Sequence, residues 1–136
     1  MQDNKEIANG FLEALWAGDT EGALSLCAPG AVWEFMPTVH SPRITSIPDA
    51  IEWYRNLVTF FDPDSGYDTE VFNIIAEGDE VAMEYNAIGK TISGGNYENF
   101  YLVRFTVREG KIFSVRPYFD TEYLSKSESG EIGKNL

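Results

Sequence analysis

The sequence predicts an α+β domain in which three helices precede a curved antiparallel sheet. Up to about residue 61, apolar residues recur at the spacing of amphipathic helices, whereas from residue 67 onward apolar and polar residues alternate as they do in strands. Short stretches that contain glycine separate the strand-like segments, as in hairpins. With 136 residues, the chain has the length of a single domain.

Three helices are expected in the N-terminal half. The first covers about residues 5–17, because its apolar residues fall on one face and Gly18 can end it. A second, short helix begins after Asp19, a residue type that caps helices well, and stops before Pro29. The third helix covers about residues 50–61, where apolar residues again recur at helical spacing.

A strand and a loop are expected between the second and third helices. Residues 31–36 predict a strand because Val, Trp and Phe favour extended structure. Residues 37–48 contain three prolines and predict a loop. At the end of this loop, either Ser46 or Asp49 could cap the third helix.

Four long strands are expected at residues 67–76, 80–90, 96–108 and 111–120, joined by tight turns into an antiparallel meander. Strands of about eleven residues are long for so small a domain, so we expect the sheet to curl. Helices laid across its concave side would leave a conical hollow. The polar residues 125–136 are expected to form a flexible tail, so the domain covers residues 1–124.

Composition excludes several classes of partner. Acidic residues outnumber basic ones by 22 to 10, giving a net charge of −12, and no basic stretch could follow a phosphate backbone or an anionic membrane. The N-terminal residues lack the basic start and apolar core expected of a signal peptide, and no apolar run is long enough to span a bilayer. Cys27, the single cysteine, is expected in the core, and together with the single histidine it provides no metal-ligand spacing. We therefore expect no metal and no other cofactor. We also expect a cytoplasmic protein.

Several segments in order resemble those of a known superfamily. They are GDTEGAL at residues 18–24, AVWEFMP at 31–37, EGDEVA at 77–82, YENFY at 97–101 and RPYFD at 116–120. In this order and spacing, the chain resembles the SnoaL-like branch of the nuclear transport factor 2-like superfamily over about residues 5–124. The resemblance implies a cone-shaped, cystatin-like α+β barrel. Because the superfamily includes isomerases, dehydratases, epoxide hydrolases and polyketide cyclases, the fold alone does not fix the reaction.

The resemblance also implies which mechanisms are absent. Of the five catalytic positions in limonene-epoxide-hydrolase-like enzymes, the chain retains Asp120 alone; the other four hold Trp33, Phe35, Tyr85 and Ala87. Epoxide hydrolysis by that mechanism is therefore not expected. The base of ketosteroid-isomerase-like enzymes falls on Phe35, and of the oxyanion-hole positions only Tyr101 could still donate a hydrogen bond. SnoaL-like cyclases use a single acid/base carboxylate, a role that the resemblance assigns to Asp120.

Candidate site residues follow from this assignment and from strand alternation. With Asp120 inside the hollow, Arg116 and Tyr118 would lie beside it and contact the substrate. Asp120 would move a proton, with Tyr101 as a catalytic hydrogen-bond donor; the other residues expected to bind the substrate are Trp33, Phe35, Trp53, Met83, Tyr85 and Asn99. His40, in the proline-rich loop, is a second candidate proton carrier.

Each candidate also has a purely structural interpretation. Asp120 could form a salt bridge with Arg116, which would lower its pKa rather than prepare it for catalysis. Asn99, Tyr101 and Tyr85 could be buried polar groups that are satisfied within the protein. His40 could be incidental to any chemistry.

The predicted function is that of a small cofactor-free enzyme of the isomerase, lyase or cyclase type, acting by proton transfer on an apolar oxygenated metabolite. A non-catalytic binding protein for a small hydrophobic ligand is one alternative, and a structural dimeric adaptor is another. The outer face of the sheet is expected to carry apolar side chains that pair two copies as a homodimer: Phe100, Leu102, Phe113 and Val115.

Overall fold

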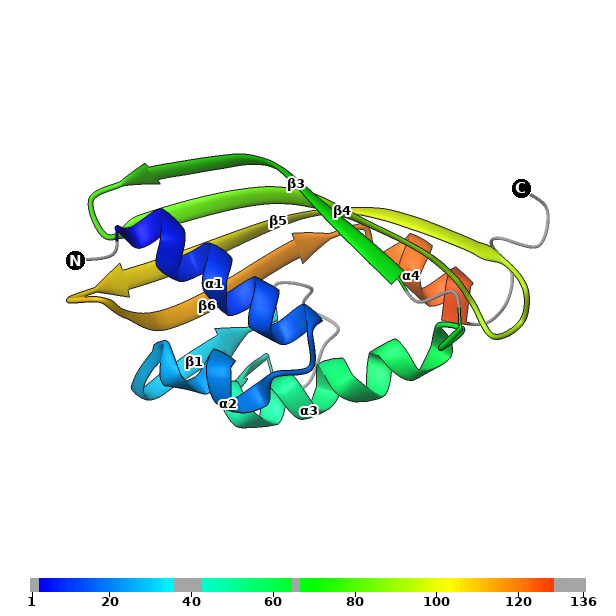
Figure 1. The fold of residues 1–136 in the computed structure, drawn as a ribbon, viewed down its shortest axis with the longest axis horizontal. Helices are drawn as coiled ribbons and strands as arrows, with labels where there is room; N and C mark the ends of the chain where they lie inside the picture. Colours follow the sequence, from blue (N-terminus) through cyan, green and yellow to red (C-terminus); the bar gives the residue numbers. More distant parts are fainter. Residues whose placement is uncertain (1–2, 36–42, 65–66, 129–136) are drawn as a thin grey trace.

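A computed structural model describes residues 3–35, 43–64 and 67–128 of the chain and confirms the α+β class (Figure 1). The elements follow in the order α1 (Asn4–Trp16), α2 (Thr20–Ser25), β1 (Cys27–Glu34), β2 (Ile44–Ser46), α3 (Ile47–Leu57), the 3-10 helix η1 (Val58–Phe60), β3 (Tyr67–Glu77), β4 (Glu80–Lys90), β5 (Asn96–Arg108), β6 (Lys111–Phe119) and α4 (Thr121–Glu128).

All six strands belong to one curled sheet, in the order β2-β1-β6-β5-β4-β3. Strands β3 to β6 form the expected antiparallel meander, whereas β1 pairs with β6 in parallel. The sheet does not close, because β2 and β3 remain at its two edges. Helix α1 contacts β3, β4, β5 and β6, while α3 contacts β1 and β2, so the helices lie along one face of the sheet (Figure 1).

Both longer N-terminal helices begin after a residue whose side chain caps them, and for α3 this residue is Ser46, one of the two predicted candidates. The side chain of Asp3 accepts a hydrogen bond from the Glu6 N–H at the start of α1, and Ser46 does the same for the Asp49 N–H at the start of α3. Helix α3 starts three residues before the predicted position. Pro48 lies in its first turn, where a missing N–H costs no intrahelical hydrogen bond.

Three other boundaries differ from the predicted ones, and those of β1 and β2 differ because of contacts distant in sequence. Strand β1 starts at Cys27 rather than residue 31, because Cys27 pairs with Ile112 of β6. Strand β2 lies within the stretch expected to be a loop, where it pairs with β1. Helix α4 extends to Glu128, so the boundary predicted at residue 124 falls inside a helix, and residues 129–136 lie outside the described residues.

The core lies between α1 and the inner face of the sheet. The rings of Phe11 and Phe105, which have no exposed surface, meet edge to face at 6.0 Å between centroids. Cys27 is half-buried at the edge of this core, and burial raises the pKa of its thiol to about 11. A second apolar cluster forms around Phe61, Tyr97 and Leu124. This second cluster joins α4 to strands β3 and β5 and to η1.

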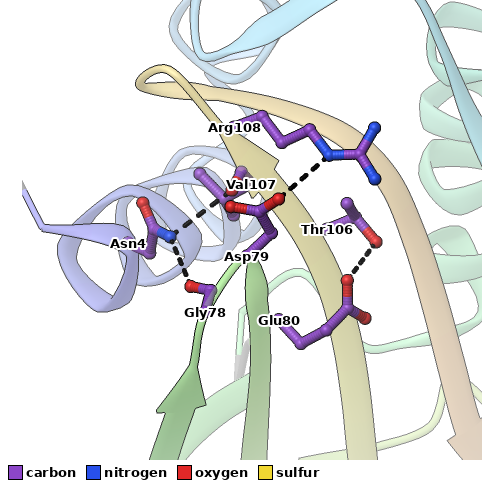
Figure 2. Close-up of polar contacts among 7 residues, drawn as sticks. All are labelled: Asn4, Gly78, Asp79, Glu80, Thr106, Val107 and Arg108. Carbon is purple, nitrogen blue, oxygen red and sulfur yellow. Dashed lines mark hydrogen bonds and ion pairs between the residues drawn. The ribbon is translucent and has the colours of Figure 1, made fainter.

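Polar contacts fasten the start of α1 to two hairpin ends (Figure 2). The Nδ2 group of Asn4 donates to the carbonyl oxygens of Gly78, at 3.2 Å, and of Val107, at 3.4 Å. Nearby, Arg108 Nε lies 3.1 Å from an Asp79 carboxylate oxygen. These contacts hold the β3–β4 and β5–β6 turns together beneath the first turn of α1.

The β5–β6 turn offers a stability prediction. Glu109 and Gly110 connect the paired residues Arg108 and Lys111, and both have positive φ, at 50° and 77°. This is the pattern of a type I′ turn, in which Asn-Gly is preferred because Asn tolerates left-handed backbone better than Glu does. We expect Glu109→Asn to raise the free energy of unfolding by about 0.5–1 kcal/mol in urea titrations.

The matched control for this substitution is Glu77→Asn. Glu77 is exposed at the end of β3 and precedes the other hairpin turn, but its φ is not positive. We expect that control to leave stability unchanged or slightly lower. Equal effects of the two substitutions would contradict the explanation from backbone strain.

Candidate functional site

A cavity of about 50 Å³ lies between the inner face of the sheet and the elements α1, α3, η1 and α4. Its lining is aromatic and aliphatic, and none of the described residues that line it is Asp, Glu, Lys, Arg or His. The lining side chains that carry a polar atom are Trp33, Trp53, Tyr54, Tyr67, Tyr85, Tyr97 and Tyr101. Any ligand here is therefore recognised by apolar contact and by neutral hydrogen-bonding groups.

A chain of hydrogen bonds runs from the backbone of the sheet to this cavity. Asn99, with 3% of its surface exposed, accepts from the Phe100 N–H at 2.9 Å through Oδ1. Its Nδ2 donates to the Asp120 carbonyl oxygen at 3.1 Å and to the hydroxyl oxygen of Tyr97 at 2.9 Å. The hydroxyl of Tyr97 in turn lies 2.6 Å from that of Tyr101.

The backbone fixes the direction of the first side-chain hydrogen bond in this chain, from Asn99 to Tyr97. Because the Phe100 N–H and the Asp120 carbonyl orient the amide of Asn99, the oxygen of Tyr97 is an acceptor. The proton of Tyr97 can then be donated to the oxygen of Tyr101 at 2.6 Å. In this arrangement the proton of Tyr101 is free for an acceptor in the cavity, which Tyr101 lines.

The tyrosines of the cavity are hydrogen-bond donors rather than bases at neutral pH. Burial, with smaller contributions from the neighbouring Tyr97, raises the pKa of Tyr101 well above that of a free phenol. Burial likewise raises the pKa of Tyr85. The rings of Tyr85 and Tyr101 are stacked at 4.9 Å with an angle of 7° between their planes, which restricts the movement of Tyr101.

Two further polar groups of the lining have no hydrogen-bond partner among the described residues: Trp33 Nε1 and the hydroxyl of Tyr54. Trp33 is 4% exposed, so its N–H is also removed from solvent. A buried polar group without a partner costs about 1–3 kcal/mol. A ligand that offered an acceptor to either group would recover part of that cost.

A comparison with protein families agrees with the fold. The model of the SnoaL-like domain family matches residues 8–115, which is most of the chain. The chain belongs to this family. A search of curated proteins found no match for this SnoaL-like domain.

Solved structures resemble the SnoaL-like domain over nearly its whole length. IdmH from Streptomyces antibioticus is 23% identical, with a TM-score of 0.79 over 94% of this chain and 99% of that one. An NTF2-like protein from Burkholderia thailandensis is 21% identical, with a TM-score of 0.75 over 94% and 98%. TerC, co-crystallised with polyporic acid, is 20% identical, with a TM-score of 0.74 over 90% and 95%. At these identities the likeness shows a shared fold.

Two structural features of the SnoaL-like domain bear on other classes of site. Among the described residues, no three His, Cys, Asp or Glu side chains are grouped so that they could hold a metal ion. The described helices include none with the length and apolar character needed to cross a membrane.

The predicted orientation of Asp120 is wrong. Tyr101 faces the cavity and pairs with Phe119, so Phe119 also faces inward and Asp120 lies beyond the end of β6. Asp120 is exposed, and its Oδ1 accepts from the Tyr123 N–H at 2.9 Å in the first turn of α4. The side chain of Asp120 therefore caps a helix instead of entering the cavity.

The rest of β6 follows the same register. Arg116 pairs with Arg104 and Tyr118 with Leu102, which places both on the outer face instead of beside a substrate. Val115, expected on the outer face, is fully buried opposite Phe105, whereas Phe113 is 40% exposed as predicted. The register shift between Thr106 and Val107 leaves Phe113 as an extra residue, which reverses the alternation along the strand.

Other predicted site residues divide into two groups. Trp33, Trp53, Tyr85 and Tyr101 line the cavity, and Asn99 reaches it through Tyr97. Phe35 and Met83 are buried in the core but are not among the lining residues. His40 lies outside the described residues.

Sequence reasoning missed three lining residues with polar tips, namely Tyr54, Tyr67 and Tyr97. Tyr97 shares a strand face with Asn99 and Tyr101, so strand alternation could have identified it. Tyr54 lies on the apolar face of α3, where it was expected only to fill the core. Its cavity-lining position depends on how α3 is placed against the sheet.

The helix-capping role of Asp120 predicts how two substitutions differ. Because Asn caps helices about as well as Asp, we expect Asp120→Asn to have the same free energy of unfolding as the wild type. Asp120→Ala removes the cap and should lower the free energy of unfolding by about 0.5–2 kcal/mol. Chemical unfolding of the three proteins checks this expectation, and it fails if Asn destabilises the domain as much as Ala.

Proposed function

We propose that this SnoaL-like domain is a small cofactor-free enzyme of the cyclase or isomerase type. Its substrate would be an apolar molecule with a carbonyl group, and its reaction would pass through an enolate. The observation that carries the proposal is the chain from Asn99 through Tyr97 to Tyr101, which presents a protonated phenol to a cavity whose described lining residues are uncharged. IdmH, whose published description proposes a polyketide cyclase, and a SnoaL-like protein from Jannaschia described in the same way support the proposed reaction type.

In this mechanism, Tyr101 donates a hydrogen bond to the carbonyl oxygen of the substrate. When a proton leaves the adjacent carbon, negative charge develops on that oxygen and the hydrogen bond becomes stronger. Tyr97 and Asn99 act as positioning residues, because they hold the oxygen of Tyr101 through successive hydrogen bonds. The low polarity of the cavity increases the strength of each of these interactions.

The identity of the base limits the class of substrate. None of the described lining residues is a carboxylate or a histidine, so the proton would leave to water or hydroxide. A carbon placed beside a carbonyl and an aromatic ring, or between two carbonyls, is acidic enough for that route. His40 as the base, the cytoplasmic location and the homodimer stay predictions of the sequence.

Hydrogen–deuterium exchange tests the proposal without knowledge of the natural substrate. The probe is 2-tetralone, a flat apolar ketone with acidic protons beside its carbonyl group, incubated in D₂O and followed by proton NMR. We expect the protein to accelerate exchange at these positions above the buffer rate. Bound 2-tetralone that exchanges at the buffer rate would overturn the enzymatic proposal.

A binding protein for a small hydrophobic ligand is the second candidate. The absence of a carboxylate and of a histidine from the described lining residues favours it, because such a lining can hold a ligand without removing a proton. The same experiment separates the two functions. Saturable binding of 2-tetralone without accelerated exchange would support the binding protein.

A further inference from the structure

A groove of about 520 Å³ adjoins the cavity. It is formed by the end of α1, by α3 and η1, by the start of β3 and by the turn between β4 and β5. Five residues line both the groove and the cavity: Leu15, Tyr54, Val58, Phe61 and Tyr67. We call these five shared residues the wall, because a single layer of side chains lies between the groove and the cavity.

The cavity alone is too small for the substrate class proposed above, on which this inference rests. Its volume of about 50 Å³ compares with about 30 Å³ for one water molecule in the liquid and with several hundred Å³ for ordinary ligand sites. The groove has about ten times the volume of the cavity. A ligand that reaches Tyr101 must extend into additional space, and among the described residues the groove shares five lining residues with the cavity.

Within the shared wall, Tyr54 is a side chain that can move without losing a hydrogen bond among the described residues. Its buried hydroxyl has no hydrogen-bond partner among the described residues, so rotation of the side chain would break no polar contact there. The backbone beside Phe61 is held more firmly. The Asp62 N–H donates to the Lys90 carbonyl at 2.7 Å, and the Ile92 N–H donates to the Phe60 carbonyl at 2.8 Å.

The lining of the groove favours a flat, apolar group. The rings of Phe61 and Tyr67 are stacked at 4.9 Å with an angle of 15° between their planes, so the wall presents aromatic surface. Ile92, which is 67% exposed, adds aliphatic surface at the β4–β5 turn. The groove's polar lining includes Arg55, Thr59 and Asp62, which suit an end of the ligand that is partly in water.

We propose that the groove is a second ligand subsite, continuous with the cavity once Tyr54 rotates. The ligand is an elongated, flat molecule with at least two rings, whose oxygen-bearing end reaches Tyr101 and whose apolar end lies in the groove. The ligand then passes Tyr54, whose hydroxyl has no hydrogen-bond partner among the described residues and can form a hydrogen bond with the ligand.

The test compares two probes that differ by one ring, phenol and 4-phenylphenol, by titrations followed with protein NMR. We expect the wild type to bind 4-phenylphenol at least about tenfold more tightly than phenol, because the second ring is buried in the groove. Ile92→Asp should reduce this ratio to less than about threefold, since a charge disfavours an apolar neighbour. Ile44→Asp is the matched control: Ile44 is 51% exposed and lines neither space.

An unchanged ratio in Ile92→Asp would overturn the subsite, and so would failure of the wild type to prefer 4-phenylphenol or to bind either probe. Tyr101→Phe separates this inference from the proposed function. If Tyr101→Phe exchanges 2-tetralone at the wild-type rate while Ile92→Asp lowers the binding ratio, the subsite stands and the role of Tyr101 as donor fails. If Tyr101→Phe slows the exchange and Ile92→Asp leaves the binding ratio unchanged, the subsite fails and the donor stands.

Discussion

Tyr101→Phe is expected to slow the protein-catalysed exchange of 2-tetralone protons by about 10²–10³-fold, the usual effect of removing one hydrogen-bond donor from a developing oxyanion. The substitution removes only a hydroxyl group, and the stacking of the ring on Tyr85 is kept. The loss should appear in the exchange rate at saturating probe, because the hydrogen bond strengthens as the enolate forms. Proton NMR of the exchange measures it directly.

Controls for this prediction come from the same pair of strands. Tyr118 lies on the outer face opposite Leu102, so Tyr118→Phe should exchange 2-tetralone at the wild-type rate. Tyr97→Phe breaks the chain between Asn99 and Tyr101, and we expect a smaller loss that reflects poorer positioning. Wild-type exchange in Tyr101→Phe would rule out the mechanism.

The pH dependence provides an independent readout of the same group. Because burial raises the pKa of Tyr101, its phenol stays protonated well beyond the range in which a free tyrosine ionises. The contribution of this donor should therefore persist to at least pH 10, and the ratio of wild-type to Tyr101→Phe rates should stay constant between about pH 7 and pH 10. A ratio that falls within this range would indicate that an ordinary, exposed phenol is responsible.

Phe100→Asp is expected to convert a homodimer into a monomer. The described helices leave the outer face of the sheet uncovered (Figure 1). We propose this dimer because that face carries exposed apolar side chains. The rings of Phe72 and Phe100 meet edge to face at 6.3 Å on this surface, and Phe100 is 60% exposed. Monomers seldom leave such a surface in water. The other exposed apolar residues that strand register assigns to this face are Ile75, Ile88 and Leu102.

The charges around this surface suit a second copy of the chain. Along β5, Glu98 lies on one side of Phe100 and Leu102, and Arg104 lies on the other. Arg104 and Arg116 share a single carboxylate, that of Glu80, at 2.7 and 3.8 Å, which leaves positive charge in excess at that end. Two-fold symmetry about the apolar centre would bring Arg104 of each copy towards Glu98 of the partner subunit.

Sedimentation velocity at micromolar concentration checks the oligomeric state. We expect the wild type and the control Ile44→Asp to sediment as dimers and Phe100→Asp as a monomer. Asp at position 100 places a charge in the centre of the proposed interface, where desolvation is most complete. A wild-type monomer would refute the dimer.

The sequence predicts well those parts of the fold that depend on local patterns. Helix α1 and the four strands of the meander have long periodic segments, and turns with glycine separate the strands, so their positions agree within one or two residues. The start of β1 and the presence of β2 depend on pairing with distant residues. Strand propensity over a few residues contains no information about such partners.

The sequence likewise predicts only part of the candidate site. Alternation along β5 correctly places Asn99 and Tyr101 on the inner face. The orientation of β6 was taken from resemblance to enzymes with an aspartate at that position, and it is wrong for Asp120. The strand's own pattern indicates the observed orientation, because apolar Val115, Pro117 and Phe119 alternate with Ser114, Arg116 and Tyr118. The depth of the cavity and the wall formed by Tyr54 depend on side-chain packing between elements.

The parallel pairing of β1 with β6 has a consequence for synthesis of the protein on the ribosome. Val32 and Trp33 find their partners, Ser114 and Val115, only near the end of the chain. The apolar face of β1 must therefore wait for β6, whereas α1 also contacts β3, β4 and β5, which are made earlier. Such an order lengthens the time during which the nascent chain exposes apolar surface that can aggregate.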